Sequence, residues 1–245
     1  NNAEQLDVMP LVGDFNFYRG IYRNVALLLT NDVCISPLDY ASPGIYLRQM
    51  KVDAQQADVK ADVMLDNPTD KTQQVEVAVE VFSGDKSIIK QQKSIRLEAQ
   101  AMVEKHTIPF TIHRPHLWNG TQDPFIYKVK VSLWQGKTLL DEVEQPLGLR
   151  YYKVDPARGF FLNGRHLQLH GVCRHQDRAV VGNALAPEDI REDMKLMREM
   201  GVNAVRLAHY PHSSYTYDQM DRAGIVTWAE TVSYTHLTLP TIYSV

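Results

Sequence analysis

The sequence predicts a multidomain protein in which an all-β part is followed by the beginning of an α/β part. Up to about residue 150, apolar and polar side chains alternate with a period of two, as in half-buried strands. After residue 150, short strands alternate with amphipathic helices, which indicates a parallel sheet. The length of 245 residues excludes a closed (β/α)8 barrel beside another domain, because such a barrel alone needs about 250 residues.

The composition is that of an ordinary globular protein, with 44% hydrophobic and 22% charged residues. The net charge of -3, from 26 basic and 29 acidic residues, shows no excess of positive charge of the kind that binds nucleic acid. No run of apolar residues is long enough to span a membrane. Cys34 and Cys173 match no metal or redox motif, and we expect two free, buried thiols.

Residues 1–44 contain too few strand-like runs to bury a core of their own. The run from Val25 to Thr30 is strand-like, and turn residues follow it at Asn31-Asp32 and Ser36-Pro37. This segment either packs on another part of the protein or ends a larger β domain.

Residues 45–150 are predicted to form an immunoglobulin-like β-sandwich. Two runs have clear period-two alternation, and their apolar members are Val75, Val77, Val79, Val81, Tyr127, Val129, Val131 and Leu133. Turns are marked by Asn67-Pro68, Ser83-Gly84 and Gln135-Gly136. No pair of cysteines crosses this unit, so it does not have the pattern of an antibody domain.

The α/β part is predicted to run strand, helix, strand, helix, strand. The first strand is expected to hold Leu167 and Leu169 and to end near His170. A helix starts at Pro187, with an apolar face formed by Ile190, Met194, Met197 and Met200 and with Gly201 after its end. Strand 202–207, helix 214–223 and strand 225–228 follow, with Gly224 behind the second helix.

Polar side chains gather at the carboxyl ends of these three strands, where ligands bind in α/β folds. They are Arg174, His175, Gln176, Asp177, Arg178, Arg206, His209, Tyr210 and Glu230. Two interpretations remain open from spacing alone: a binding site for a hydroxyl-rich or anionic ligand, or an arginine–carboxylate network that orders loops. No zinc, nucleophile-elbow or phosphate-loop motif is present.

Motifs in order along residues 1–231 resemble glycoside hydrolase family 2, which includes β-galactosidases and β-glucuronidases. They lie at residues 15–23, 148–150, 159–164, 170–177 and 203–211, followed by Asp221, Gly224 and 228–230. Gln176 stands where many members carry Glu, and Arg19 stands where Gly is usual. Leu207 and Thr216 are looser matches in the second barrel motif.

The resemblance implies four segments. Residues 1–44 would end a jelly-roll sugar-binding domain, and residues 45–150 would form the immunoglobulin-like sandwich. Residues 151–231 would supply the first three βα units of an incomplete TIM barrel. Residues 232–245 contain no Asp, Glu, Lys or Arg and carry no motif of this resemblance. We interpret them as an artefactual or non-family tail, and a genuine variable loop is the alternative.

The resemblance also implies a retaining exo-glycosidase that acts on terminal β-glycosidic bonds of a glycoside or β-linked oligosaccharide, with β-galactosides the favoured substrate. Asp14, His175, Arg206 and His209 would bind the terminal sugar, and Glu230 would support them. A bacterial cytoplasmic or periplasmic location is expected, and the parent enzyme could form a homo-oligomer.

The resemblance implies no catalytic residue within the chain. In the family the acid/base follows an Asn on the fourth barrel strand and the nucleophile lies on the seventh, and the sequence contains no Asn-Glu dipeptide. We therefore expect the 245-residue chain to be inactive, and assign neither a metal nor a cofactor. The competing hypothesis is a non-catalytic carbohydrate-binding or structural β-sandwich module.

Overall fold

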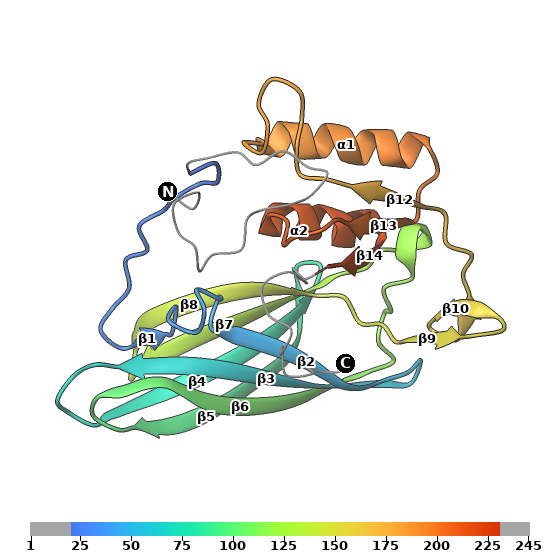
Figure 1. Ribbon diagram of the computed structural model, residues 1–245. Helices are drawn as coiled ribbons and strands as arrows, with labels where there is room; N and C mark the ends of the chain where they lie inside the picture. Colours follow the sequence, from blue (N-terminus) through green and yellow to red (C-terminus); the bar gives the residue numbers. More distant parts are fainter. Residues whose placement is uncertain (1–20, 231–245) are drawn as a thin grey trace.

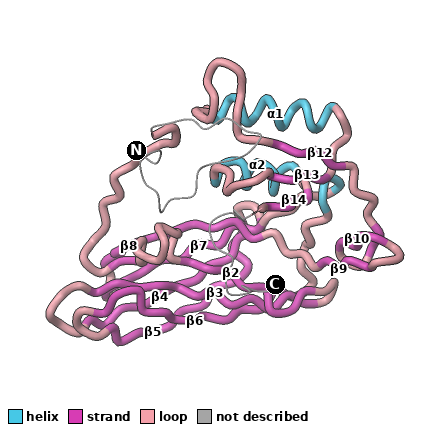
Figure 2. The backbone as a smooth tube through the Cα atoms, viewed as in Figure 1, coloured by secondary structure: helices cyan, strands magenta, loops and turns pink. Residues whose placement is uncertain are grey.

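Two regions of different architecture make up residues 21–230, the part of the chain that the computed structural model describes. A β-sandwich forms the larger region, and a small α/β region lies over one of its sides (Figures 1 and 2). Asp14 and the tail 232–245, both singled out from the sequence, lie outside the described residues.

The sandwich is built from two antiparallel four-stranded sheets. In the first sheet, a long central strand pairs with three others: β3 (Gln56–Asn67) with β1 (Cys34–Ile35), β2 (Ile45–Val52) and β6 (Ala101–His113). The second sheet has the order β5 (Lys86–Leu97), β4 (Gln73–Ser83), β7 (Tyr127–Gln135) and β8 (Thr138–Leu147). Two antiparallel sheets face to face confirm the predicted sandwich.

The sandwich core follows the period-two pattern of the sequence. Val77 pairs with Leu133 and Val79 with Val131 across β4 and β7, and all four side chains are completely buried. The facing sheet contributes a second row from β3 and β6, which includes Val59, Val63, Leu65 and Phe110. Cross-strand apolar pairs on one face are the main stabilising unit of a sheet, so the local pattern is sufficient to specify this core.

Short hairpins connect the strands of the second sheet. Gly84 follows β4 with φ of 59°, and Gly136 follows β7 with φ of 58°. A positive φ at the first position of a two-residue hairpin favours glycine, because residues with an L side chain rarely adopt this backbone conformation. The turns expected at Ser83-Gly84 and Gln135-Gly136 are confirmed.

The strand-like run from Val25 to Thr30 is not a strand in the structure. Leu27 and Leu29 are 86% and 84% exposed, and no described segment pairs with them. Apolar residues alone do not make a strand, because the backbone needs a hydrogen-bonding neighbour. The first described strand is β1, which precedes residue 44 and pairs with β3 of the sandwich.

A three-stranded meander connects the two regions. It consists of β9 (Tyr152–Asp155), β10 (Gly159–Leu162) and β11 (Arg165–His166), none of which was expected from the sequence. The amide of Leu167 still donates to the carbonyl of Phe160, 2.9 Å away, so Leu167 extends the meander. The prediction of a parallel strand ending near His170 was wrong, since that strand starts at Gly171.

The α/β region has a parallel sheet of order β12 (Gly171–Arg174), β13 (Ala204–Leu207) and β14 (Val226–Ala229). Helices α1 (Pro187–Glu199) and α2 (Ser214–Ala223) connect the strands, in agreement with the predicted α/β order. Met200 was expected on the apolar face of α1 but is 69% exposed, because it caps the helix end and lies beyond the last turn.

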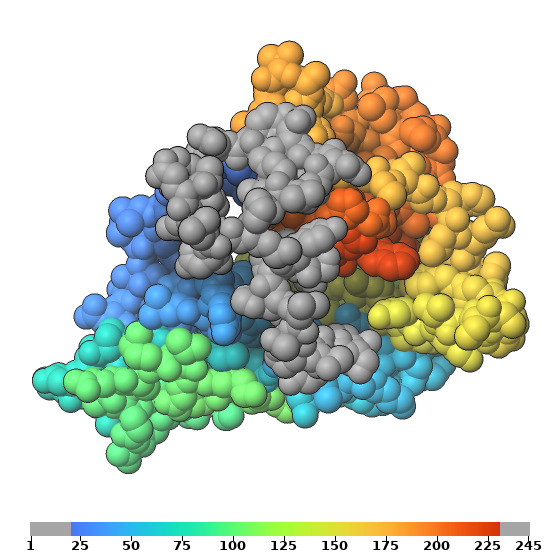
Figure 3. Space-filling model, viewed as in Figure 1, coloured from blue at the N-terminus to red at the C-terminus, as the bar shows by residue number. Residues whose placement is uncertain are grey.

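The sandwich touches the α/β region at the end of α2. The indole Nε1 of Trp118 donates to the carbonyl of Asp221 at 2.8 Å. Nearby, the turn η2 (Gly120–Gln122) approaches Gly224 so closely that a Cβ on Gly224 would lie 2.2 Å from the Gly120 oxygen. Figure 3 shows the yellow meander near residue 160 lying against both regions. This junction fixes how the sheet β12–β14 stands on the sandwich.

Candidate functional site

Alternation along the three parallel strands sorts their side chains onto two faces. Val205 and Leu207 are buried in a cluster with methionines of α1 and α2, so Arg206 between them points to the other face. The strand register places Cys173, Arg206 and Trp228 side by side on that face. Trp228 is 69% exposed, so in the described part of the chain this face is open.

Cys173 corrects one expectation. Cys34 is buried and both thiols are free, as predicted, but Cys173 is exposed. Its strand position faces away from the helices, and no layer in residues 21–230 covers it. Burial therefore depends here on the face of the strand and not on residue type.

Arg206 and Glu230 form a two-pronged ion pair at the carboxyl end of the sheet. Arg206 Nε donates to Glu230 Oε1 at 2.7 Å, and Nη2 donates to Oε2 at 3.0 Å. The hydrogen bonds from Arg206, and then from His209, lower the pKa of the Glu230 carboxyl. Glu230 is therefore an ionised acceptor at neutral pH, in agreement with a supporting role.

His209 joins this pair through one ring nitrogen. Its Nδ1 lies 2.8 Å from Glu230 Oε2 and 3.1 Å from Arg206 Nη2. A guanidinium nitrogen only donates and a carboxylate only accepts, so Nδ1 cannot serve both partners. We assign the proton to Nδ1, which donates to Glu230 over the shorter distance. The ring is thereby fixed by the same carboxylate that holds Arg206.

His175 lies beside His209 at the same sheet edge. Their ring centroids are 5.4 Å apart at an interplanar angle of 78°, and the Tyr210 ring is 6.5 Å from His175. The structure thus brings together three residues that the resemblance proposed for sugar binding, namely His175, Arg206 and His209. Their roles remain a prediction, as does that of Asp14.

Two further arginines of the cluster, Arg174 and Arg178, connect loops and helices instead. Arg178 donates to Asp189 at 2.9 Å and to Glu192 at 2.7 Å, which ties the loop after β12 to the first turns of α1. Arg174 is buried and donates to Asp193. The arginine–carboxylate network, one of the two interpretations left open by the sequence, is therefore present at Arg174 and Arg178, whereas ligand binding stays a prediction.

One buried polar residue of this region, His212, is not identified by the sequence analysis. His212 is 4% exposed and contacts Arg174, beneath the loop that carries His209. The sequence signal that could have identified His212 was its position three residues after His209. Spacing alone cannot show which side chains of a loop are buried.

Among residues 21–230, no group of His, Cys, Asp and Glu is arranged to hold a metal ion. Within the same residues, no helix is long and apolar enough to cross a membrane.

Comparison with known families decides the classification. The sequence profile described as "Glycosyl hydrolases family 2" matches residues 44–150. A second profile, "Glycosyl hydrolases family 2, TIM barrel domain", matches residues 154–244. The chain belongs to glycoside hydrolase family 2. The sheet β12–β14 is accordingly the start of the TIM barrel, and no closed barrel is present in the described residues.

The chain is similar to relatives named beta-glucuronidase and to relatives named beta-galactosidase. It is 59% identical to a beta-glucuronidase of Bacteroides fragilis over 94% of this chain and 33% of that protein. It is 30% identical to a beta-galactosidase of Bacteroides ovatus over 86% of this chain and 24% of that protein. The chain thus spans about a third or less of the length of these relatives.

Solved structures agree with this grouping. The crystal structure of Bacteroides uniformis beta-glucuronidase superposes with a TM-score of 0.86 at 31% identity, over 93% of this chain and 27% of that one. A putative beta-galactosidase from Bacteroides fragilis superposes with a TM-score of 0.80 at 35% identity, over 82% of this chain and 30% of that one.

Proposed function

We propose that the protein carrying this chain is a retaining exo-glycosidase that hydrolyses terminal β-glycosidic bonds. The observation that supports this most is the cluster of Arg206, His209 and Glu230, with His175 beside it, at the carboxyl end of a family 2 barrel sheet. In this proposal His175, Arg206 and His209 bind the hydroxyl groups of the terminal sugar and hold its ring while charge develops at the anomeric carbon.

A β-glucuronide is the first substrate to test. The 59% identical relative is named a beta-glucuronidase, whereas the beta-galactosidase relative is 30% identical. This ranks glucuronides ahead of the galactosides that the motifs alone favoured. Galactosides remain the second candidate because relatives of both names align over most of the chain.

Hydrolysis of a glycosidic bond requires catalytic carboxylates that we do not assign among the described residues. A retaining glycosidase needs two carboxylates about 5–5.5 Å apart, one as nucleophile and one as acid/base. Glu230 accepts from Arg206 and His209, and its lowered pKa makes it a poor proton donor. We therefore propose that the 245-residue chain binds glycosides without hydrolysing them, which keeps a non-catalytic sugar-binding role as the second candidate.

The test compares the protein encoded by the complete gene with two variants. Arg206→Lys keeps the charge but loses the two-pronged contact, and Arg96→Lys is the matched control because Arg96 forms an exposed pair with Glu98 on the sandwich. Hydrolysis of 4-nitrophenyl β-glucuronide, β-galactoside and β-mannoside is measured. We expect turnover of one of the first two, reduced about 100-fold by Arg206→Lys and unchanged by Arg96→Lys. Absence of turnover for all three sugars contradicts the proposal.

A further inference from the structure

The loop between β13 and α2, residues 208–213, carries His209 on one side and buries His212 on the other. His212 is 4% exposed, whereas the side chain of His209 is 39% exposed. The two imidazoles have different surroundings although three positions separate them. His212 takes no part in the ion pair of Arg206 and Glu230, so its burial calls for another explanation.

Hydrogen bonds fix His212 in one tautomer. Arg174 Nη1 lies 3.0 Å from His212 Nδ1, and because a guanidinium has no acceptor, Nδ1 must accept. Nε2 then carries the proton and donates to the carbonyl of Ala208 at 3.1 Å. Burial lowers the pKa of His212 to about 4, and the Arg174 charge acts in the same direction, so the ring is neutral near pH 7.

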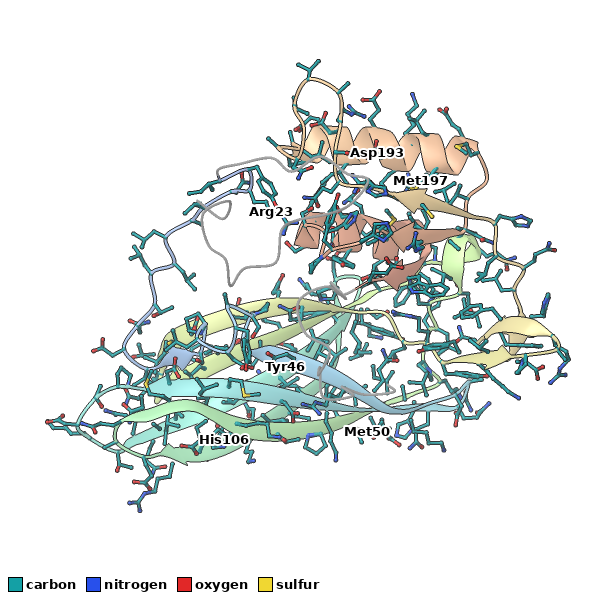
Figure 4. All side chains as sticks on the ribbon, viewed as in Figure 1. Arg23, Tyr46, Met50, His106, Asp193 and Met197 are labelled. Carbon is teal, nitrogen blue, oxygen red and sulfur yellow. The ribbon has the colours of Figure 1, made fainter. Side chains whose placement is uncertain are left out.

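Arg174 is itself held in place. Its Nε and Nη2 donate to Asp193 Oδ2 at 3.0 and 2.8 Å, and the guanidinium is buried between β12 and α1. The side chain of Asp193 lies on α1 (Figure 4). An ordered chain of hydrogen bonds therefore runs from α1 through Arg174 and His212 to the carbonyl of Ala208, the residue directly before His209.

Other contacts hold different parts of the same loop. Gln176 Oε1 accepts from the amide of Ser213 at 2.8 Å, and the amide of Gln176 donates to the hydroxyl of Tyr210. Arg23 donates to the carbonyl of Pro211 at 2.7 Å. These contacts keep the loop attached at residues 210–213, while His212 is the side chain that reaches back to the peptide preceding His209.

We propose that His212 is a positioning residue that fixes the Ala208–His209 segment and thereby holds the His209 imidazole against Glu230. The role in sugar binding that this gives His212 rests on the proposed function of His209. Replacing His212 with an apolar residue leaves the contacts of Gln176 and Arg23 in place, so we expect His209 to lose its fixed orientation while the α/β region stays folded.

The kinetic test uses two variants of the protein encoded by the complete gene. His212→Leu removes both hydrogen bonds, whereas His212→Gln keeps an acceptor for Arg174 and a donor for Ala208 on one amide. His113→Leu is the matched control, because His113 is exposed on β6 of the sandwich. We expect His212→Leu to lower kcat for the β-glycoside about 100-fold with a smaller change in KM, His212→Gln to recover most of it, and His113→Leu to change neither.

A second measurement does not need activity. Long-range ¹H–¹⁵N NMR spectra of the 245-residue chain report which nitrogen of each imidazole carries the proton. We expect Nε2–H for His212 and Nδ1–H for His209, with the His209 signals displaced in His212→Leu and retained in His212→Gln. If no β-glycoside is hydrolysed, the proposed function fails, yet these spectra still decide the positioning role. Unchanged His209 signals in His212→Leu, or unfolding of the α/β region in that variant, would overturn it.

Discussion

The sandwich and the α/β region differ in how the two faces of their sheets are covered. In the sandwich, the inward faces of both sheets bury each other, and Val77, Val79 and Leu133 are fully covered. In the α/β region, helices cover one face of the sheet and the other carries Arg206 and the exposed Trp228. The first region gains stability from a closed core, whereas in the second, residues 21–230 provide no layer over the face that carries Arg206. Stability and the candidate site are thus placed in separate regions, which can be tested by perturbing each one.

The largest effect is expected from truncating the core of each region. Leu133→Ala in β7 and Leu207→Ala in β13 each remove a fully buried side chain, and each should cost about 3 kcal/mol or more of unfolding free energy. If the regions are independent, each variant shifts one of two transitions in urea-induced unfolding, followed by circular dichroism. A single shared transition that both variants shift equally would show that the two regions unfold as one unit.

The next largest effect is expected for the stability of the α/β region when the pH is lowered. The folded pKa of His212 is about 4, below its ordinary value of 6.5, so between these values the unfolded imidazole binds a proton that the folded one does not. Stability should therefore fall as pH falls from 6.5 to 4, by about 3 kcal/mol in total. Burial is the main cause of the lowered pKa, and electrostatic interactions with Arg174, Arg23 and His175 act in the same direction, while the hydrogen bond to the Ala208 carbonyl opposes it.

The measurement is the urea midpoint of the α/β transition at several pH values, with His212→Gln as the comparison. The glutamine variant cannot titrate, so its stability should change less over this window. Equal pH dependence in the two proteins would show that another group is responsible.

A smaller effect is expected at the junction between the regions. Gly224 and Gly201 have φ of 74° and 71°, so alanine is strained at both by about 1 kcal/mol. Only at Gly224 would the new Cβ also meet backbone, 2.2 Å from the Gly120 oxygen. Gly224→Ala should therefore lower the thermal midpoint clearly more than Gly201→Ala. Equal shifts would mean that the junction can open without cost.

The smallest effect is expected for Arg23→Ala. The hydrogen bond from Arg23 to Pro211 is exposed to solvent, so its loss should cost about 1 kcal/mol or less. Faster hydrogen exchange confined to residues 208–213 is the expected readout, with Arg158→Ala on the meander as control, because Arg158 is also exposed and pairs locally with Asp155. No change in exchange at this loop would show that Arg23 does not hold it.

Local signals predicted much of the fold. Period-two alternation identified the inward residues of β4 and β7, because each side chain's face follows from its position in the strand. Pro187 and Gly224 marked helix ends correctly, because their backbone preferences act without tertiary context. The run at Val25–Thr30 failed for the opposite reason, since a strand requires a neighbour that sequence pattern does not supply.

The sequence by itself determined that polar residues collect at the ends of three parallel strands, and its motifs indicated the family. Only the tertiary structure decided which of them meet. Arg206 faces the open side and pairs with Glu230 and His209, whereas Arg174 faces the helices and pairs with Asp193 and His212. The physical reason is that a one-residue change in where a strand begins exchanges its two faces, and the pairing between distant strands fixes that register.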